Sequence, residues 1–358
     1  MQIIGSDRTV DKRSSPQQAS PPPAAGPSSS LQVPSWQTQL KEAIRTPAKL
    51  CAYLGLESGR WQPGAEDGHA LFPIRVPLAY ARRMVHGDPH DPLLRQVLPV
   101  AQETDTVRGY SIDPLQEAAH TPRPGLIHKY RNRVLLIASG GCAINCRYCF
   151  RRHFPYQDNR PSRTHWADTL DYVLAHPEIN EVILSGGDPL LMADHRLAEL
   201  IAQIEKLPHV TRLRIHTRLP VVIPDRITDA LCHRLSASRL QQVMVLHINH
   251  PAEIDEAVSA AAARLHAAKV TVLNQSVLLR GVNDDVAVLA SLSERLFAAG
   301  ILPYYLHTLD PVAGAAHFDV PDRDATALMD ALRAQLAGFL MPQLVREIPG
   351  QVSKTPLY

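Results

Sequence analysis

Three cysteines, Cys142, Cys146 and Cys149, lie close together in the stretch GCAINCRYCF. Three thiolates from one short loop can hold a four-iron cluster and leave one iron open for another ligand. With a fourth ligand such as His153 they could instead hold zinc, and a third interpretation is three unconnected buried thiols. Because the cysteines directly follow the β-branched run RVLLIA, we favour the iron–sulfur cluster.

Composition narrows the class of protein that carries these cysteines. The chain has 358 residues, of which 45% are hydrophobic and 20% charged, as in globular proteins with a substantial core. Its formal net charge of +2 argues against a nucleic-acid binder that works through bulk charge. No apolar run approaches the roughly 20 residues that span a bilayer, and no signal segment is evident. We therefore expect a cytoplasmic protein, in which clustered cysteines bind metal more often than they form disulfides.

The chain divides into three parts by its pattern. Residues 1–34 are rich in proline, alanine and serine, which predicts a disordered tail. Residues 35–125 show amphipathic helical periodicity broken by prolines, which predicts an N-terminal helical cap. Residues 126–358 alternate between strand-like and helical segments. We expect the chemistry to reside in this last part.

Six short β-branched runs alternate with helical segments in the third part. The runs are RVLLIA, EVILSG, RLRIHT, QVMVLHI, VTVLNQSVLL and ILPYYLHT, and the helical segments are 166–175, 196–207, 224–235, 253–268, 285–299 and 323–339. Strand–helix units in series predict a parallel sheet with helices outside it. The fold class is therefore α/β, and we expect a partial (β/α)6 barrel.

Polar residues gather directly after each predicted strand. The cysteines follow the first strand, and SGGD, TRLP, HINH, RGVND and TLD follow the next five in order. Ligands of such folds bind at the carboxyl ends of the strands. Six polar clusters at equivalent ends therefore predict one shared site.

The cysteine spacing, with Tyr148 before the last cysteine, resembles that of the radical S-adenosylmethionine enzymes. The resemblance implies a [4Fe-4S] cluster whose open iron binds S-adenosyl-L-methionine and cleaves it reductively to a 5′-deoxyadenosyl radical. The segment SGGDPL resembles the glycine-rich segment that contacts the methionyl amino group, which implies cofactor contacts by Ser185, Gly186, Gly187 and Asp188. Taken alone, the glycine pair could equally be a strand-end turn.

From about residue 36 onward the chain resembles the lysine 2,3-aminomutase family. The segments that carry the resemblance are HKYRNRVLL, CRYCFRRHF, LSGGDPLL, RLPVVIPDRIT, NQSVLLRGVND and PYYLHTLD. The family adds pyridoxal 5'-phosphate, which is bound as a Schiff base by a lysine in a loop near the end of the barrel. Lys354, in REIPGQVSKTPLY, is the matching position.

Two departures separate this chain from the aminomutases proper. Their lysine follows a run of glycines, whereas Lys354 follows PGQVS, and they continue beyond it with cysteines that help to bind an intersubunit zinc. Cys51 and Cys232 are single and distant, so we expect no zinc. The amino-acid sequence of the cysteine segment most resembles that of the elongation factor P (R)-β-lysylation branch of the family.

The resemblance also implies residues that bind the pyridoxal cofactor and the substrate. Lys129 and Arg133 match positions that contact the cofactor phosphate, and Arg218 matches another cofactor-contacting arginine. For each of these cations, a plain surface charge is the alternative interpretation.

At the substrate, Arg151 resembles the arginine that grips the carboxylate of lysine, a bidentate task that suits a guanidinium. Asp310 matches an acid that binds the far ammonium group. Glu347 aligns with a second acid, although a cap or a salt bridge is the default interpretation of either acid alone. His247 and His250 could line the S-adenosylmethionine pocket, but strand-end histidines are more often structural.

These implications together predict an isomerase that converts (S)-α-lysine to (R)-β-lysine for modification of elongation factor P. Its expected partners are lysine, an electron donor such as a flavodoxin or ferredoxin, and the ligase that receives β-lysine, with no nucleic acid and no membrane. One alternative is an aminomutase that acts on free lysine or another amino acid in metabolism. A second is a non-enzymatic iron–sulfur redox sensor.

Overall fold

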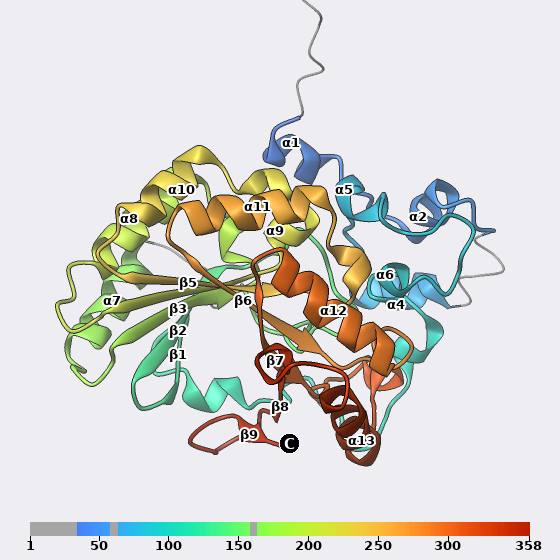
Figure 1. Ribbon diagram of the computed structural model, residues 1–358. Coiled ribbons are helices and arrows are strands. Elements are labelled where there is room, and N and C mark those ends of the chain that lie inside the picture. Colours follow the sequence, from blue (N-terminus) through green and yellow to red (C-terminus); the bar gives the residue numbers. More distant parts are fainter. Residues whose placement is uncertain (1–33, 58–63, 158–162) are drawn as a thin grey trace, which may run out of the picture. The chain divides into compact units, whose positions relative to one another are not determined.

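Parallel strands β2 to β8 form the centre of the sheet in this computed structural model, which describes residues 34–57, 64–157 and 163–358 (Figure 1). Strand β1 is antiparallel to β2, and β9 is antiparallel to β8. The strands are β1 (Leu126–Tyr130), β2 (Arg133–Ser139), β3 (Glu181–Gly186), β4 (Arg212–Thr217), β5 (Gln241–His247), β6 (Thr271–Val277), β7 (Leu302–His307), β8 (Gln343–Arg346) and β9 (Thr355–Pro356). They lie side by side in chain order with β1 and β9 at the edges, so the sheet is open. This confirms the predicted α/β partial barrel.

All six predicted strands are present as β2 to β7, whereas β1, β8 and β9 were not predicted. Strand β8 has four residues, of which only Leu344 and Val345 are buried, and β9 has two. Runs this short carry no period-two signal, and their pairing with neighbouring strands decides their conformation. The parallel part of the sheet is therefore one strand wider than predicted.

Helices follow the strands and lie outside the sheet (Figure 1). They are α7 (Arg163–Leu174), α8 (Asp194–Ile204), α9 (Leu219–Val222), α10 (Asp229–Ser236), α11 (Glu256–Ala267), α12 (Val286–Ala298) and α13 (Asp322–Arg333). The predicted helix over 224–235 begins later, because Thr228 caps α10 by accepting a hydrogen bond from the Leu231 amide at 3.1 Å. Asp255 and Asp285 cap α11 and α12 in the same way.

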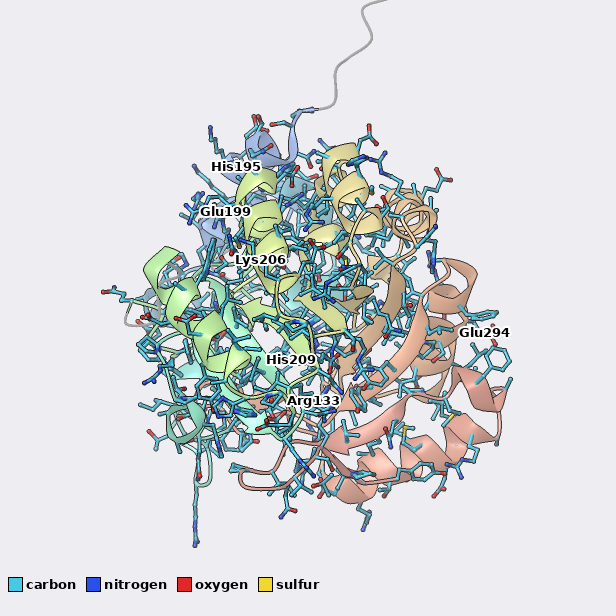
Figure 2. The ribbon with its side chains drawn as sticks, turned by 90° about the vertical axis from the view of Figure 1, so that its left-hand side faces the viewer. Arg133, His195, Glu199, Lys206, His209 and Glu294 are labelled. Carbon is cyan, nitrogen blue, oxygen red and sulfur yellow. The ribbon has the colours of Figure 1, made fainter. Side chains whose placement is uncertain are left out.

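Helix α8 shows how sequence pattern fixes the packing of these helices. Its apolar residues recur at helical spacing, and Leu197, Leu200, Ile201 and Ile204 are all buried. Figure 2 looks onto this helix from outside, with His195 on its exposed surface. The helix thus covers the sheet with one face only.

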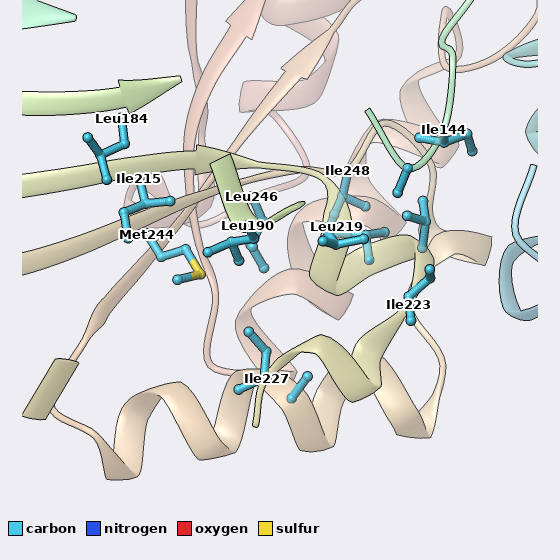
Figure 3. Close-up of a cluster of buried hydrophobic side chains, with 14 of the residues drawn as sticks. Ile144, Leu184, Leu190, Ile215, Leu219, Ile223, Ile227, Met244, Leu246 and Ile248 are labelled. Carbon is cyan, nitrogen blue, oxygen red and sulfur yellow. The ribbon is translucent and has the colours of Figure 1, made fainter. Parts of the chain in front are cut away.

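The two faces of the sheet differ in chemistry because successive side chains of a strand point to opposite sides. On β4, Leu213 and Ile215 are buried on the helix side, where residues such as Met244 and Leu246 of β5 join them in one apolar cluster (Figure 3). Residues Arg214 and His216 alternate with them and lie half-buried on the other face. The inner face of the partial barrel is therefore polar.

The N-terminal region contains several short helices. They are α1 (Trp36–Lys41), α2 (Pro47–Tyr53), α4 (Ala65–Leu71), α5 (Leu78–Ala81) and α6 (Pro92–Arg95), followed by the 3₁₀ turns η1 (Ala101–Thr104) and η2 (Glu117–His120). Residues Ser35–Tyr358 form one compact unit, and the boundary at 125/126 stays a prediction. The predicted disordered tail lies outside the described residues, apart from Pro34.

We expect Leu200→Ala to lower the free energy of unfolding by about 2–5 kcal/mol, since it removes a fully buried side chain between α8 and the sheet. His195→Ala on the exposed face of the same helix is the matched control and should cost less than about 0.5 kcal/mol. Urea denaturation followed by circular dichroism measures both. Equal losses for the two variants would contradict this packing of α8.

Candidate active site

The three cysteines lie on the loop that follows β2 at the carboxyl edge of the sheet. Burial and, less strongly, the neighbouring cysteines together raise the pKa of the Cys142 thiol well above its ordinary value and that of Cys149 to about 11. Such thiols face one another closely enough to interact electrostatically. Positive charge bound among them would favour the thiolate forms that ligate metal.

This donor set fits a four-iron cluster better than a zinc ion. Within residues 34–57, 64–157 and 163–358, no three His, Cys, Asp or Glu side chains converge as ligands of a single ion. The Nε2 atom of His153, the fourth ligand that zinc would need, instead lies 3.1 Å from the Ala313 carbonyl oxygen. A cube of iron and sulfide separates its ligands more widely than one ion does, and three cysteines leave one of its irons open.

The N-terminal region holds the cysteine loop in place. Arg147, between the second and third cysteines, is fully buried, and its Nε donates to Glu103 Oε1 at 2.8 Å. Its terminal nitrogens donate to the second oxygen of Glu103 and to the carbonyls of Phe72 and Gly68. Glu103 also accepts from Arg152 at 2.7 Å. A buried carboxylate shared by two guanidinium groups thus ties η1 to the loop.

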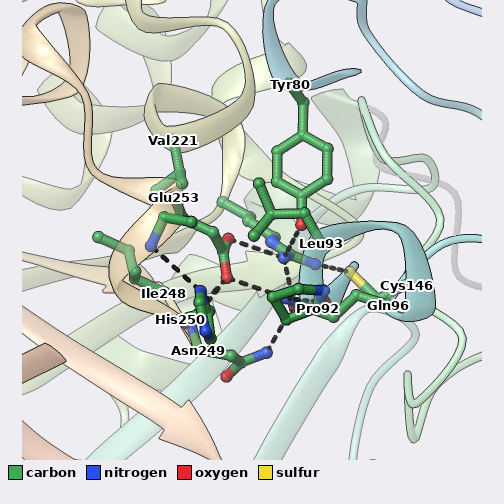
Figure 4. A network of polar contacts seen from close by, with 12 residues as sticks. Tyr80, Pro92, Leu93, Gln96, Cys146, Val221, Ile248, Asn249, His250 and Glu253 are labelled. Carbon is green, nitrogen blue, oxygen red and sulfur yellow. Dashed lines mark hydrogen bonds and ion pairs between the residues drawn. The ribbon is translucent and has the colours of Figure 1, made fainter. Parts of the chain in front are cut away.

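Arg218, directly after β4, lies against the middle cysteine of this loop. Figure 4 shows the polar network to which Cys146, Gln96 and Glu253 belong. The Nη1 atom of Arg218 donates to Cys146 Sγ at 2.7 Å, and its Nη2 is 2.8 Å from Glu253 Oε2 and 2.6 Å from Gln96 Oε1. The Tyr80 hydroxyl lies 3.1 Å from the same nitrogen. The predicted cofactor contact of Arg218 stays a prediction, and its position is at the cysteine loop.

The SGGD segment packs directly against the cysteine loop. Gly186 has a φ of 109°, and a Cβ atom on Gly187 would lie 2.1 Å from the Gly141 carbonyl oxygen. Both positions therefore require glycine. The buried carboxylate of Asp188 accepts four hydrogen bonds, from the Thr217 hydroxyl and from the backbone amides of residues 190, 218 and 219. Asp188 thus joins the ends of β3 and β4.

Arg151 lies buried between the cysteine loop and the interior of the barrel. Its Nε and Nη2 donate to the two carboxylate oxygens of Glu117 at 2.8 and 2.7 Å, and its Nη1 donates to Ser185 Oγ at 3.2 Å. The structure thus brings the predicted carboxylate-binding arginine onto the SGGD segment. Glu117 was not predicted, since it belongs to no motif.

Lys354 lies in the barrel with two of the other predicted residues. Its Nζ donates to Glu347 Oε2 at 2.8 Å, and Lys129 Nζ donates to Glu347 Oε1 at 2.9 Å. Burial alone would raise the pKa of Glu347, but the two ammonium groups outweigh it and lower the pKa to about 2. The Arg133 guanidinium lies over the Tyr130 ring, 4.8 Å from its centroid, on the same hairpin as Lys129.

Asp310 follows β7 and faces the same group of charges. Burial raises the pKa of its carboxyl to about 7, and the ammonium of Lys354 offsets only part of that rise. Among the described residues, no hydrogen-bond or ion-pair partner is found for its side chain. Of the two predicted acids, Glu347 is already bonded to two lysines, whereas Asp310 can still bind a cation.

Comparison with known proteins identifies the family of this chain. Residues 136–292 match the Radical SAM superfamily. The chain is 51% identical to "L-lysine 2,3-aminomutase" of Escherichia coli (strain K12), over 91% of this chain and 96% of that protein. It is 36% identical to the Clostridium subterminale protein of the same name, over 90% of this chain and 77% of that protein. The chain belongs to the lysine 2,3-aminomutase family.

Membership confirms several predictions made from the sequence. The protein is an isomerase of the radical S-adenosylmethionine type, which works with a [4Fe-4S] cluster and S-adenosylmethionine. A non-enzymatic redox sensor is therefore the wrong alternative. No helix in the described part of the chain has both the length and the apolarity to cross a membrane.

Three histidines lie on the inner face of the barrel, and of these only His247 was considered from the sequence, as a residue that could line the S-adenosylmethionine pocket. They are His216 on β4, His247 on β5 and His307 on β7, and burial lowers the pKa of each, to about 3 for His247. They are thus neutral at pH 7. The alternation in RLRIHT could have placed His216 on the polar face.

We expect Glu103→Gln to lower the free energy of unfolding by about 3–5 kcal/mol, because Arg147 and Arg152 would lose their shared buried anion. Glu205→Gln, which removes the acid of the more exposed pair with Arg234, is the control and should cost at most about 1 kcal/mol. Chemical denaturation compares them. A loss at Glu103 no larger than at Glu205 would show that this carboxylate does not anchor the loop.

Proposed function

We propose that this enzyme binds pyridoxal 5'-phosphate through Lys354 and converts (S)-α-lysine to (R)-β-lysine. The observation that carries the proposal is the position of the Lys354 amine, which Glu347 holds in the barrel beside Lys129. The proteins of Escherichia coli and Haemophilus influenzae, each 51% identical to this chain, bear the name of this reaction.

The residues around Lys354 suit a phosphorylated aromatic aldehyde. Lys129 and Arg133 supply cationic groups for a phosphate, and Tyr305 presents its ring 5.8 Å from Lys354 Nζ. When bound, pyridoxal phosphate supplies a conjugated carbonyl to which a primary amine can attach. Lys354 would hold that group through its amine, which the substrate amine could then replace.

Two further side chains can distinguish lysine from other amino acids. Arg151 offers a guanidinium to the α-carboxylate, and Asp310 offers an anion to the distant ammonium. A lysine ammonium without a partner away from water would cost several kcal/mol. Glu347 is already shared by Lys354 and Lys129, so we assign the ammonium contact to Asp310 and keep Glu347 as the acid that positions the two lysines.

We further propose that the product serves β-lysylation of elongation factor P, with electrons supplied by a flavodoxin or ferredoxin in the cytoplasm. The resemblance of GCAINCRYCFRRHFPY to that branch supports this role. Synthesis of β-lysine for metabolism is the alternative. Deleting the gene and measuring the mass of elongation factor P separates them, because only the first role predicts loss of the modification.

We expect borohydride reduction of the pyridoxal-loaded enzyme to label Lys354. Lys354→Ala should lose the visible band of lysine-bound pyridoxal phosphate, at roughly 420 nm, and should form no β-lysine. It should retain the cluster absorption, since the cysteines lie on another loop. Lys206→Ala, a change on the turn after α8, is the control and should behave as the unchanged enzyme (Figure 2). Peptide mapping that finds the label on another lysine would refute the assignment.

Asp310→Asn should lower kcat/KM for lysine by at least about 30-fold, because truncating one partner of a buried charge pair costs about 2–5 kcal/mol. It should lower the discrimination between lysine and norleucine, which lacks the ammonium. Asp229→Asn, at an exposed position, is the control. Unchanged discrimination in Asp310→Asn would remove this residue from the pocket.

The same carboxyl predicts a pH dependence. With a pKa of about 7, Asp310 is protonated at lower pH, so lysine binding then requires release of a proton. We expect kcat/KM to fall by up to about tenfold for each pH unit below that pKa, and to lose this dependence in Asp310→Asn. Coincident profiles for the two enzymes would assign the titration elsewhere.

A further inference from the structure

Glu117 is a buried acid that belongs to none of the sequence motifs described above. It begins η2, and its amide donates to Asp113 Oδ1 at 3.0 Å. Gln116, directly before it, has a φ of 51°, a conformation that costs a residue other than glycine about 1 kcal/mol. Thr121 Oγ1 donates to the Glu117 carbonyl at 2.8 Å. The backbone is thus fixed on both sides of this side chain.

The contact between Glu117 and Arg151 uses one edge of the guanidinium. A guanidinium has five N–H groups. The N–H on Nε and one N–H on Nη2 donate to Glu117, and one N–H on Nη1 donates to Ser185. One N–H on each terminal nitrogen makes no hydrogen bond within the described residues. These two N–H groups remain available to a second carboxylate.

Glu117 also faces the cation at the other end of the site. Its Oε1 atom lies 3.8 Å from Lys129 Nζ, which in turn pairs with Glu347. Burial raises the pKa of Glu117, but Arg151 and then Lys129 outweigh it, so that the pKa lies below its usual range. Glu117 is therefore an anion placed between two cations to which the proposed function gives different ligands.

We propose that Glu117 is the positioning residue for recognition of the substrate α-carboxylate: it holds Arg151 by its Nε and Nη2 edge so that the remaining N–H groups of the terminal nitrogens meet the carboxylate. The inference rests on the proposed function of Arg151. A guanidinium fixed in this way would favour amino acids over their amides, because it matches a planar anion with two oxygens.

The geometry defines one competing role with the opposite consequence. Glu117 could occupy Arg151 in place of the substrate, which would then have to displace it. In that case, weakening the ion pair between Glu117 and Arg151 would strengthen lysine binding, whereas under the positioning role the same change would weaken it. The sign of the change therefore separates the two roles.

The test measures equilibrium binding of radiolabelled lysine to the pyridoxal-loaded enzyme without S-adenosylmethionine, so that no turnover occurs. We expect Glu117→Gln to raise the Kd for lysine by at least about tenfold, the usual effect of weakening a hydrogen-bonded charge pair. It should reduce the preference for lysine over lysinamide, and Glu117→Asp should restore part of it. Glu205→Gln, in the more exposed pair with Arg234, is the matched control and should change neither value.

A double mutant shows whether Glu117 acts through Arg151. In an Arg151→Lys background the guanidinium is gone, so Glu117→Gln should add less than about twofold to the Kd. Tighter lysine binding in Glu117→Gln, an unchanged Kd, or equal losses for lysine and lysinamide would each overturn the proposal. If the unchanged enzyme binds no lysine, or if Lys354 is not labelled by borohydride, the proposed function itself fails.

Discussion

The architecture of the site depends on the burial of one guanidinium, that of Arg218. A buried cation costs several kcal/mol unless it is paired and hydrogen-bonded. The partners of the two terminal nitrogens of Arg218 come from three separate parts of the chain, while its Nε has no hydrogen-bond partner among the described residues. Tyr80 and Gln96 belong to the N-terminal region, Glu253 follows β5, and Cys146 lies on the loop after β2. Correct pairing of this charge therefore requires the N-terminal region, the strand ends and the cysteine loop to be assembled together.

A second layer of order comes from the alternation of side chains along the strands. Because one face of each strand packs against helices, polar residues of the other face collect inside the barrel without any local attraction between them. Leu213 and Ile215 are buried between the sheet and the helices, so Arg214 and His216, which alternate with them, point to the inner face of the barrel. Most of the predicted site residues, such as Arg151, Asp310 and Lys354, lie instead on loops that follow the strands.

Much of this could be read from the sequence, and the failures have a common cause. The strands β2 to β7 and the cysteine loop were predicted from the local sequence pattern. The roles of Lys354, Arg151 and Asp310 were predicted from the resemblance to a family. Glu117 and Glu103 lie in an N-terminal region whose local pattern indicates only helix. Their partners are 34 and 44 residues away, and no spacing rule predicts a side-chain pair at such separations. Strand β8 was missed for the same reason, since its partner β7 determines it.

The charges from Arg151 through Glu117, Lys129 and Glu347 to Lys354 alternate in sign, and their side chains are at most 23% exposed. Counter-ions screen exposed charges over roughly 10 Å at 0.1 M salt but penetrate little among buried ones. Ionic strength should therefore leave recognition inside the barrel almost untouched while it weakens any encounter guided by the outer surface. Added salt thus offers a way to separate docking of a protein partner from events within the enzyme.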